Sequence, residues 1–220
     1  MIKCCIFDLD GTLLDTLTTI TYYVNLVFER HGIDTLTNEE CKKFVGSGAE
    51  NLIRRALEYK GVCDGDRAVK ILAEYVNEYD RNPLHLTTAF PGIEETLLSL
   101  KAKGIKLTVL SNKPDSAVKN IVASFFPNIF DAVYGQINGV PMKPEPSMAN
   151  RVIGDMGASN SETAFIGDTE IDILTGKNLG VGLNIGVLWG FRGLDELKRA
   201  GADTVVSSAQ EILSEITAVN

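Results

Sequence analysis

The chain has 220 residues, a formal net charge of −8 and an ordinary proportion of apolar and charged residues. This length allows one large domain, or a domain that carries an insertion, with a substantial core. The acidic balance argues against a nucleic-acid or anionic-membrane partner, because both require a basic surface. No apolar run approaches the roughly 20 residues that span a bilayer, and no signal peptide is visible. We therefore expect a cytoplasmic globular protein, either a monomer or a homodimer.

The N-terminal stretch is a short apolar run that ends in Asp8-Leu9-Asp10-Gly11. An apolar run of this length before a turn signal predicts a buried strand. Ligands bind at the carboxyl ends of strands in open parallel sheets, so Asp8 and Asp10 are candidate site residues. Two acids held so close together indicate that a cation or phosphate chemistry uses them.

The segment from residue 16 to residue 86 carries no strand signal. Apolar residues recur there at helical spacing, which predicts helices over about residues 17–30, 38–44, 52–59 and 66–79, with a break at Gly46-Ser47-Gly48. An insertion of roughly 70 residues is far longer than an ordinary connection between a strand and a helix. We therefore predict an all-helical cap domain over residues 16–86, inserted into a core domain of residues 1–15 and 87–220. A long insertion after the first strand is well placed to act as a lid.

From residue 90 onward, predicted strands and helices alternate. The strands are expected over residues 105–110, 130–134, 163–166, 181–187 and 204–206, and the helices over 93–100, 114–126, 147–156, 170–179, 194–200 and 209–216. This alternation predicts an α/β fold with a doubly wound parallel sheet and right-handed crossovers.

Polar residues follow several of these predicted strands. Ser111-Asn112 follows the 105–110 strand, Lys143 lies in the loop after the 130–134 strand, and Gly167-Asp168 follows the 163–166 strand, with Asp172 one helical turn later. Each segment alone has an ordinary explanation, such as a helix cap or a solvated lysine. The carboxyl ends of parallel strands meet at one edge of the sheet, so we expect all of them to converge with Asp8. Trp189 is expected to be a packing residue close to this edge.

Together these segments resemble the four motifs of the haloacid dehalogenase (HAD) superfamily of phosphoryl-transfer enzymes. The first motif, Asp-x-Asp-Gly-Thr, is similar to residues 8–12, and the second, an apolar strand that ends in Ser or Thr, to residues 109–111. The third motif is a lysine, here Lys143 in a Lys-Pro-x-Pro segment, and the fourth, Gly-Asp-x-x-x-Asp, is similar to residues 167–172. Order and spacing agree over essentially the whole chain. The resemblance implies a HAD-like Rossmannoid core with a helical cap.

The resemblance also implies a Mg²⁺-dependent phosphatase that hydrolyses a small phosphorylated metabolite through an aspartyl-phosphate intermediate. Asp8 would be the nucleophile, and Asp10 would protonate the leaving oxygen and then deprotonate the attacking water. The carboxylates of Asp8 and Asp168 and the main-chain carbonyl of Asp10 would bind Mg²⁺. Asp172 would support these ligands from behind.

The resemblance assigns the phosphate to a second group of residues. The Ser111 hydroxyl and the Asn112 main-chain N–H would hold phosphoryl oxygens. Lys143 would neutralise both the phosphate and Asp8. Thr12 would shape the loop after the first strand and is a further candidate for substrate binding.

Two further segments favour one family within the superfamily, and they are less diagnostic than the four motifs. The segment Phe44–Ala49 and the tail from Val187 to Asp203 are similar to phosphoglycolate phosphatases, so 2-phosphoglycolate is the best candidate substrate. The alternatives are a β-phosphoglucomutase-like mutase and a pyrophosphatase or nucleotidase of the same superfamily. A phospho-receiver domain is a different, non-enzymatic alternative, but its acids occupy other positions and it carries no cap.

Overall fold

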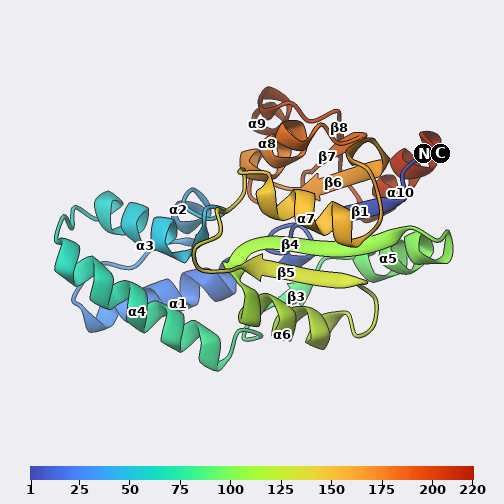
Figure 1. Ribbon diagram of the computed structural model, residues 1–220. Coiled ribbons are helices and arrows are strands. Elements are labelled where there is room, and N and C mark those ends of the chain that lie inside the picture. Colours follow the sequence, from blue (N-terminus) through green and yellow to red (C-terminus); the bar gives the residue numbers. More distant parts are fainter. The chain divides into compact units, whose positions relative to one another are not determined.

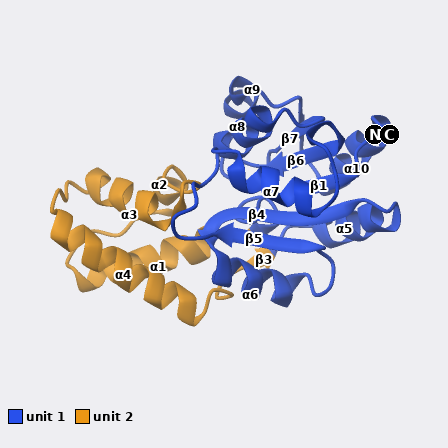
Figure 2. Cartoon of the chain, in the orientation of Figure 1, with its two compact units in different colours: residues 1–14, 89–220 blue, residues 15–88 orange.

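The computed structural model describes residues 1–220 and divides into two compact units. Unit 1 comprises Met1–Leu14 and Ala89–Asn220, and unit 2 comprises Asp15–Thr88 (Figure 2). The chain passes between the units through two short strands, β2 (Leu14–Asp15) and β3 (Thr88–Ala89), which form a two-stranded sheet. Neither strand is anticipated from the sequence, because two residues carry no periodic signal.

Unit 1 is built on a six-stranded sheet with the order β5-β4-β1-β6-β7-β8 (Figure 1). Its strands are β1 (Cys4–Phe7), β4 (Lys106–Pro114), β5 (Ala132–Gln136), β6 (Thr163–Gly167), β7 (Leu183–Val187) and β8 (Thr204–Val206). All of the ladders are parallel. The predicted doubly wound α/β fold is therefore confirmed.

Helices cover both faces of this sheet. They are α5 (Ile93–Ala102), α6 (Asp115–Phe125), α7 (Ser147–Asp155), α8 (Glu170–Leu179), α9 (Leu194–Ala200) and α10 (Ala209–Ala218), with a short 3₁₀ turn at Asn160–Glu162. On one face, Cys4 and Ile6 of β1 pack with residues of α7 and with Leu179 of α8. On the other face, the Phe7 ring lies edge-on to that of Phe130. The core thus lies on both sides of β1, as expected for a fully buried strand.

Several strand boundaries differ from the prediction. β4 continues four residues beyond Leu110, to Pro114, with an irregular register between those two residues. β5 begins at Ala132 instead of Phe130, because Asp131 already exchanges main-chain and side-chain hydrogen bonds with Leu107 before the strand. β7 begins at Leu183, directly after Gly182, whose N–H donates to the carbonyls of Asn160 and Thr163.

Unit 2 consists of four helices: α1 (Leu17–Arg30), α2 (Asn38–Lys42), α3 (Gly48–Tyr59) and α4 (Gly65–Arg81). The aromatic side chains of α1 and α4 pack together, with the Tyr23 and Tyr79 rings 5.4 Å apart. α3 begins at Gly48, earlier than predicted, because its first turn carries almost no apolar residues to mark the helical period. None of the helices in the chain combines the length and the apolarity that a membrane span requires.

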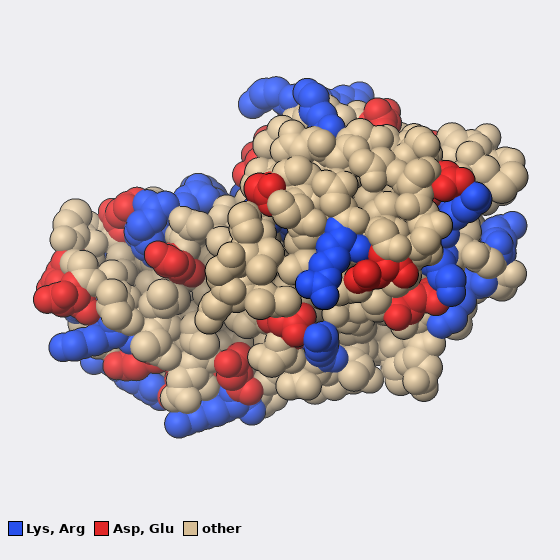
Figure 3. Space-filling view, viewed as in Figure 1, with Lys and Arg blue, Asp and Glu red and all other residues tan.

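Charged residues of both signs are interspersed on the face shown in Figure 3. Blue and red side chains alternate there over short distances, and no continuous basic area is present on that face.

Candidate active site

The loop after β1 is folded tightly and approaches β6. Asp8 follows β1 directly, and its N–H donates to the Ile166 carbonyl at 3.0 Å. Gly11 has a φ of +84°, and a Cβ at that position would lie 2.3 Å from Oδ2 of Asp168. Only glycine combines this backbone conformation with the close approach. The glycine of the first motif therefore brings the Asp8 loop against Asp168.

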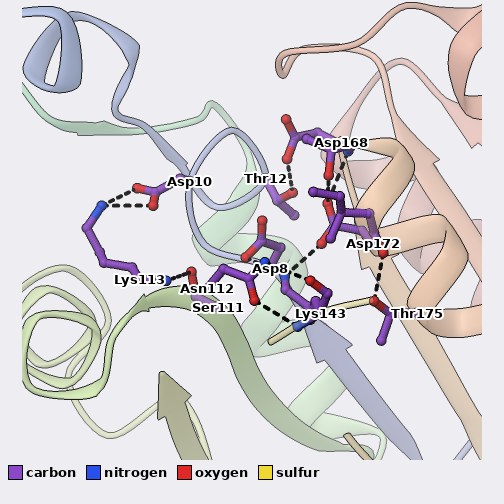
Figure 4. A network of polar contacts seen from close by, with 12 residues as sticks. Asp8, Asp10, Thr12, Ser111, Asn112, Lys113, Lys143, Asp168, Asp172 and Thr175 are labelled. Atoms are coloured by element: carbon purple, nitrogen blue, oxygen red, sulfur yellow. Dashed lines mark hydrogen bonds and ion pairs between the residues drawn. The ribbon is translucent and has the colours of Figure 1, made fainter. Parts of the chain in front are cut away.

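Three carboxylates gather where β1 and β6 end side by side (Figure 4). Asp8, Asp168 and Asp172 each offer an oxygen, and these atoms lie within 4.8 Å of one another. All three residues are buried, with exposed fractions of 7, 0 and 1%. Buried carboxylates need compensating positive charge, which the neighbouring residues must supply.

Lys143 supplies one buried positive charge to this cluster. Its Nζ lies 2.9 Å from Oδ1 of Asp8 and 2.7 Å from Oδ1 of Asp172. Burial alone would lower the pKa of Lys143, but Asp172 and Asp8 outweigh that effect and raise it above its usual value. Lys143 is therefore a permanent cation between two acids.

One lysine does not balance three acids. Burial raises the pKa of Asp8 to about 7, with a further contribution from Asp172 that Lys143 opposes. Burial, followed by the charges of Asp172 and Asp8, also raises the pKa of Asp168 well above its usual value. An excess of buried carboxylate oxygens suits a hard divalent cation, which prefers oxygen ligands. The donor set therefore fits a metal ion.

The Asp168 carboxylate is held on both of its oxygens. The Thr12 hydroxyl donates to Oδ1 at 2.8 Å, and the Phe191 N–H donates to Oδ2 at 2.8 Å. A Cβ at Gly190 would lie 2.3 Å from the Asp168 Cβ, so this segment packs directly on the carboxylate. Thr12 thus faces Asp168, and the contact of the Phe191 N–H with Asp168 is not predicted from the sequence.

Trp189 packs against a neighbouring ring and also donates a hydrogen bond to the loop after β1. Its ring lies near that of Phe90, at 6.2 Å between centroids, and its Nε1–H donates to the Thr12 carbonyl at 3.0 Å. The segment after β7 is thereby tied to the loop after β1. The signal in the sequence is the Trp-Gly-Phe segment directly after a predicted strand, at the same edge of the sheet as Asp168.

Asp172 has two roles at once. Its Oδ2 accepts from the Thr169 N–H at 3.0 Å and from the Thr169 hydroxyl at 2.7 Å, which caps α8, while its Oδ1 binds Lys143. A Cβ at Gly167 would lie 2.2 Å from the Asp172 Cβ. The capping interpretation is therefore confirmed, and the same carboxylate also contacts the buried lysine.

Ser111 and Asn112 are buried near the end of β4, with exposed fractions of 4 and 5%. The Asn112 side chain donates to the Lys143 carbonyl at 3.1 Å and accepts from the Lys143 N–H at 2.9 Å. This amide fixes the main chain that carries the buried lysine. From the sequence only the main-chain N–H of Asn112 is expected at the site, and this side-chain contact is not predicted.

The Asp10 side chain does not join the acidic cluster. Both of its oxygens contact Nζ of Lys113, at 2.9 and 2.8 Å, and Figure 4 shows this pair to one side of Asp8 and Lys143. The structure thus brings together Asp8, Thr12, Lys143, Asp168 and Asp172, and places the Asp10 carboxylate on a different lysine. The only hint of Lys113 in the sequence is its position directly after Ser111-Asn112.

Comparison with known proteins identifies a matching family and several similar proteins. Residues 5–184 match the family described as haloacid dehalogenase-like hydrolase. A phosphoglycolate phosphatase from Haemophilus influenzae is 29% identical over 94% of this chain and 95% of its own length. A second one, from Cereibacter sphaeroides, is 31% identical over 80% of this chain and 81% of its own length.

Solved structures agree in fold. A protein from Lactobacillus delbrueckii subsp. bulgaricus, assigned as a phosphoglycolate phosphatase, has a TM-score of 0.92 at 34% identity and covers 97% of this chain and 98% of its own. A protein from Thermotoga maritima, assigned as a β-phosphoglucomutase, has a TM-score of 0.76 at 22% identity, which shows a shared fold alone. With its acidic cluster at the strand ends and a family match over most of its length, the chain belongs to the haloacid dehalogenase-like hydrolases.

Proposed function

We propose that this phosphatase of the haloacid dehalogenase-like family uses Mg²⁺ to hydrolyse a small phosphate monoester, with 2-phosphoglycolate as the best candidate. The observation that carries the proposal is the buried cluster of Asp8, Lys143, Asp168 and Asp172 at the ends of β1 and β6. It combines a carboxylate nucleophile, a fixed cation and an oxygen donor set for a divalent ion.

In the first half-reaction, an Asp8 oxygen attacks phosphorus, an O–P bond forms, and the bond to the leaving oxygen breaks. Asp10 gives a proton to that leaving oxygen. Lys143, which contacts Asp8, neutralises charge on the phosphoryl oxygens. The Ser111 hydroxyl and the Asn112 main-chain N–H hold those oxygens.

In the second half-reaction, Asp10 takes a proton from water, and the water oxygen attacks the phosphorus of the aspartyl-phosphate. The bond between phosphorus and Asp8 breaks, which releases phosphate and restores the Asp8 carboxylate. The carboxylates of Asp8 and Asp168 and the Asp10 carbonyl would hold Mg²⁺, supported by Asp172. When bound, Mg²⁺ supplies positive charge that lets an anionic nucleophile approach an anionic ester.

The substrate proposal rests on the two relatives, whose names specify phosphoglycolate, and on the match to them over most of the chain. A β-phosphoglucomutase-like mutase remains the second candidate, because a fold of this kind also occurs in a protein assigned that activity. The pyrophosphatase and nucleotidase alternatives concern the same site and differ only in the leaving group. A phospho-receiver domain would not turn over repeatedly.

We also propose that unit 2, which covers the predicted insertion at residues 16–86, is a cap domain that acts as a lid. A cap of this kind would exclude water and contribute to the choice of substrate. The orientation of the two units with and without a phosphate analogue tests the lid. An identical orientation in both states would count against it.

The test of the proposed function is a panel of phosphate esters compared by kcat/KM in the presence of Mg²⁺. The panel contains 2-phosphoglycolate, pyrophosphate, nucleoside monophosphates and hexose phosphates. We expect sustained release of phosphate over many turnovers, with 2-phosphoglycolate the best substrate. Conversion of a hexose 1-phosphate into the 6-phosphate without free phosphate would favour the mutase, and a single turnover would favour the receiver domain.

The variant Asp8→Asn is the control for this panel. It removes the nucleophilic oxygen without changing the size of the side chain, so turnover should be abolished while the circular dichroism spectrum is unchanged. Appreciable residual activity with every ester would remove Asp8 from the mechanism.

A further inference from the structure

The site contains a second lysine that the mechanism above does not use. Nζ of Lys113 contacts both carboxylate oxygens of Asp10, and the two side chains are only 10 and 15% exposed. Lys143 lies on the other side of the nucleophile, against Asp8 and Asp172. The two lysines therefore place positive charge on two different sides of the Asp8 loop (Figure 4).

The main chain at Lys113 is held in a definite position. Lys113 lies in the irregular part of β4, between Leu110 and Pro114, where a change of register redirects side chains. A Cβ at Gly135 of β5 would lie 2.7 Å from the Lys113 carbonyl oxygen, so β5 packs closely on this segment. The Gly135 N–H also donates to the Asp115 carboxylate at 3.0 Å. Lys113 is thus presented from a rigid strand end, as a recognition residue should be.

The position of Lys113 relative to the reaction follows from its contact with Asp10. Under the proposed function, Asp10 hydrogen-bonds to the leaving oxygen of the ester, so the organic part of the substrate lies beside Asp10. Two hydrogen bonds of about 2.8 Å through one carboxyl group put Nζ of Lys113 roughly 5–6 Å from that oxygen. A carboxylate attached directly to the ester carbon falls within reach of this ammonium group.

We propose that Lys113 is a specificity-determining residue that binds an anionic substituent, in particular a carboxylate, on the leaving group of the substrate. When the substrate is present, its carboxylate takes the place of one Asp10 oxygen on Nζ of Lys113, while the other Asp10 oxygen keeps its contact with Nζ. The released Asp10 oxygen then faces the leaving oxygen. The proposal rests on the proposed phosphatase activity and deepens it, because it assigns the anionic end of a small phosphorylated acid to a residue of unit 1.

The experiment compares 2-phosphoglycolate with 2-hydroxyethyl phosphate, an ester of the same length whose leaving group is uncharged, in wild type and in Lys113→Met. Hydrogen bonds to charged groups contribute enough for a change of roughly 10- to 100-fold. We expect wild type to have the higher kcat/KM for 2-phosphoglycolate. In the variant, the ratio of kcat/KM for the two esters should fall by about 10- to 100-fold, mainly because KM for 2-phosphoglycolate rises. Lys113→Arg keeps the charge and should retain part of the preference.

The matched control is Lys119→Met, which removes an exposed lysine of α6 that pairs with Asp115 at 2.7 Å. Its ratio of kcat/KM for the two esters should equal that of wild type. An equal loss on both esters in Lys113→Met would overturn the proposal and leave Lys113 as a positioning residue for Asp10. A wild-type enzyme that hydrolyses both esters equally well would also overturn it.

A second measurement uses only the wild-type enzyme and does not depend on the folding of a variant. We expect glycolate to inhibit competitively and ethylene glycol not to inhibit at the same concentration. Equal inhibition by both would overturn the role of Lys113 while leaving the phosphatase activity intact. Absence of Mg²⁺-dependent hydrolysis of every ester would instead overturn the proposed function, and this proposal with it.

Discussion

At the scale of single residues, the main feature of the site is that buried carboxylates require positive charge nearby. Asp8, Asp168 and Asp172 are almost completely buried, and Lys143 is the cation that contacts two of them. Removal of one partner from a buried ion pair costs more free energy than the pair itself contributes, because it leaves a desolvated charge behind. Lys143 should therefore matter for stability as well as for turnover.

The variant Lys143→Met tests this at pH 8 in the absence of metal. We expect the free energy of unfolding in urea to fall by about 3–5 kcal/mol, because Asp8 and Asp172 lose their cation. Lys119→Met, which removes an exposed lysine, should change it by less than about 0.5 kcal/mol. Added Mg²⁺ should restore part of the loss. If the two variants are equally stable, Lys143 does not compensate the cluster.

Asp10 permits a second test at the same scale, since a general acid matters most for a poor leaving group. Asp10→Asn should lower kcat for an alkyl phosphate by roughly 10²–10⁴-fold. With 4-nitrophenyl phosphate the loss should be much smaller, because that leaving group departs without a proton. Asp8→Asn, in contrast, should abolish activity with both esters. Equal losses on both esters in Asp10→Asn would argue against its role as the acid.

At the scale of elements, glycines set how closely β6 and α8 approach the carboxylates. Gly167 ends β6, and a Cβ there would overlap the Asp172 Cβ, which lies in the first turn of α8. Asp172 caps that helix and binds Lys143 at the same time. Any shift of the first turn of α8 therefore changes the site.

The variant Gly167→Ala should lower the free energy of unfolding by about 1–3 kcal/mol, as overpacked core positions do, and should reduce turnover. The control is Gly154→Ala in the exposed part of α7, where a Cβ meets nothing within 4 Å. There we expect stabilisation by about 0.5–1 kcal/mol, because alanine is the better helix former. Urea unfolding measures both, and destabilisation of the same size at both positions would contradict the packing argument.

At the scale of the whole molecule, the buried acids couple folding to pH and to metal. Burial raises the pKa of Asp8 to about 7 and that of Asp168 well above its usual value. The folded protein therefore holds protons that the unfolded chain has already released above about pH 4. Without metal, the free energy of unfolding should consequently fall as the pH rises from about 4 to 7.

Mg²⁺ should reverse this trend, because it binds only the ionised carboxylates. At 100 times its dissociation constant, a ligand adds about 2.7 kcal/mol of stability, or roughly 5–10 °C in Tm for a chain of this size. We expect a shift of this order at pH 7.5 and little shift at pH 5, measured by thermal unfolding. Asp168→Asn should reduce the shift at pH 7.5. Equal shifts at both pH values would show that these acids do not bind the ion.

The alternation of strands and helices in unit 1 is readable from the sequence, and so are the polar residues that end β1 and β6. Both follow from local patterns: hydrophobic periodicity marks each element, and parallel strands deliver their carboxyl ends to one edge. The same reasoning predicts the helices of unit 2. It predicts boundaries less well, because hydrogen bonds with distant segments, such as those of Asp131 and Gly182 next to β5 and β7, leave no local pattern.

The partner of each charged group is decided only by the tertiary structure. Asp10 meets Lys113 across 103 residues of chain, Asn112 clamps Lys143 across 31, and the Phe191 N–H reaches Asp168 across 23. No local period encodes these contacts, because they depend on side-chain directions after an irregular strand end and on backbone approaches that only Gly11 and Gly190 permit. The sequence thus determines that acids and lysines reach one edge of the sheet, whereas packing determines which lysine compensates which acid.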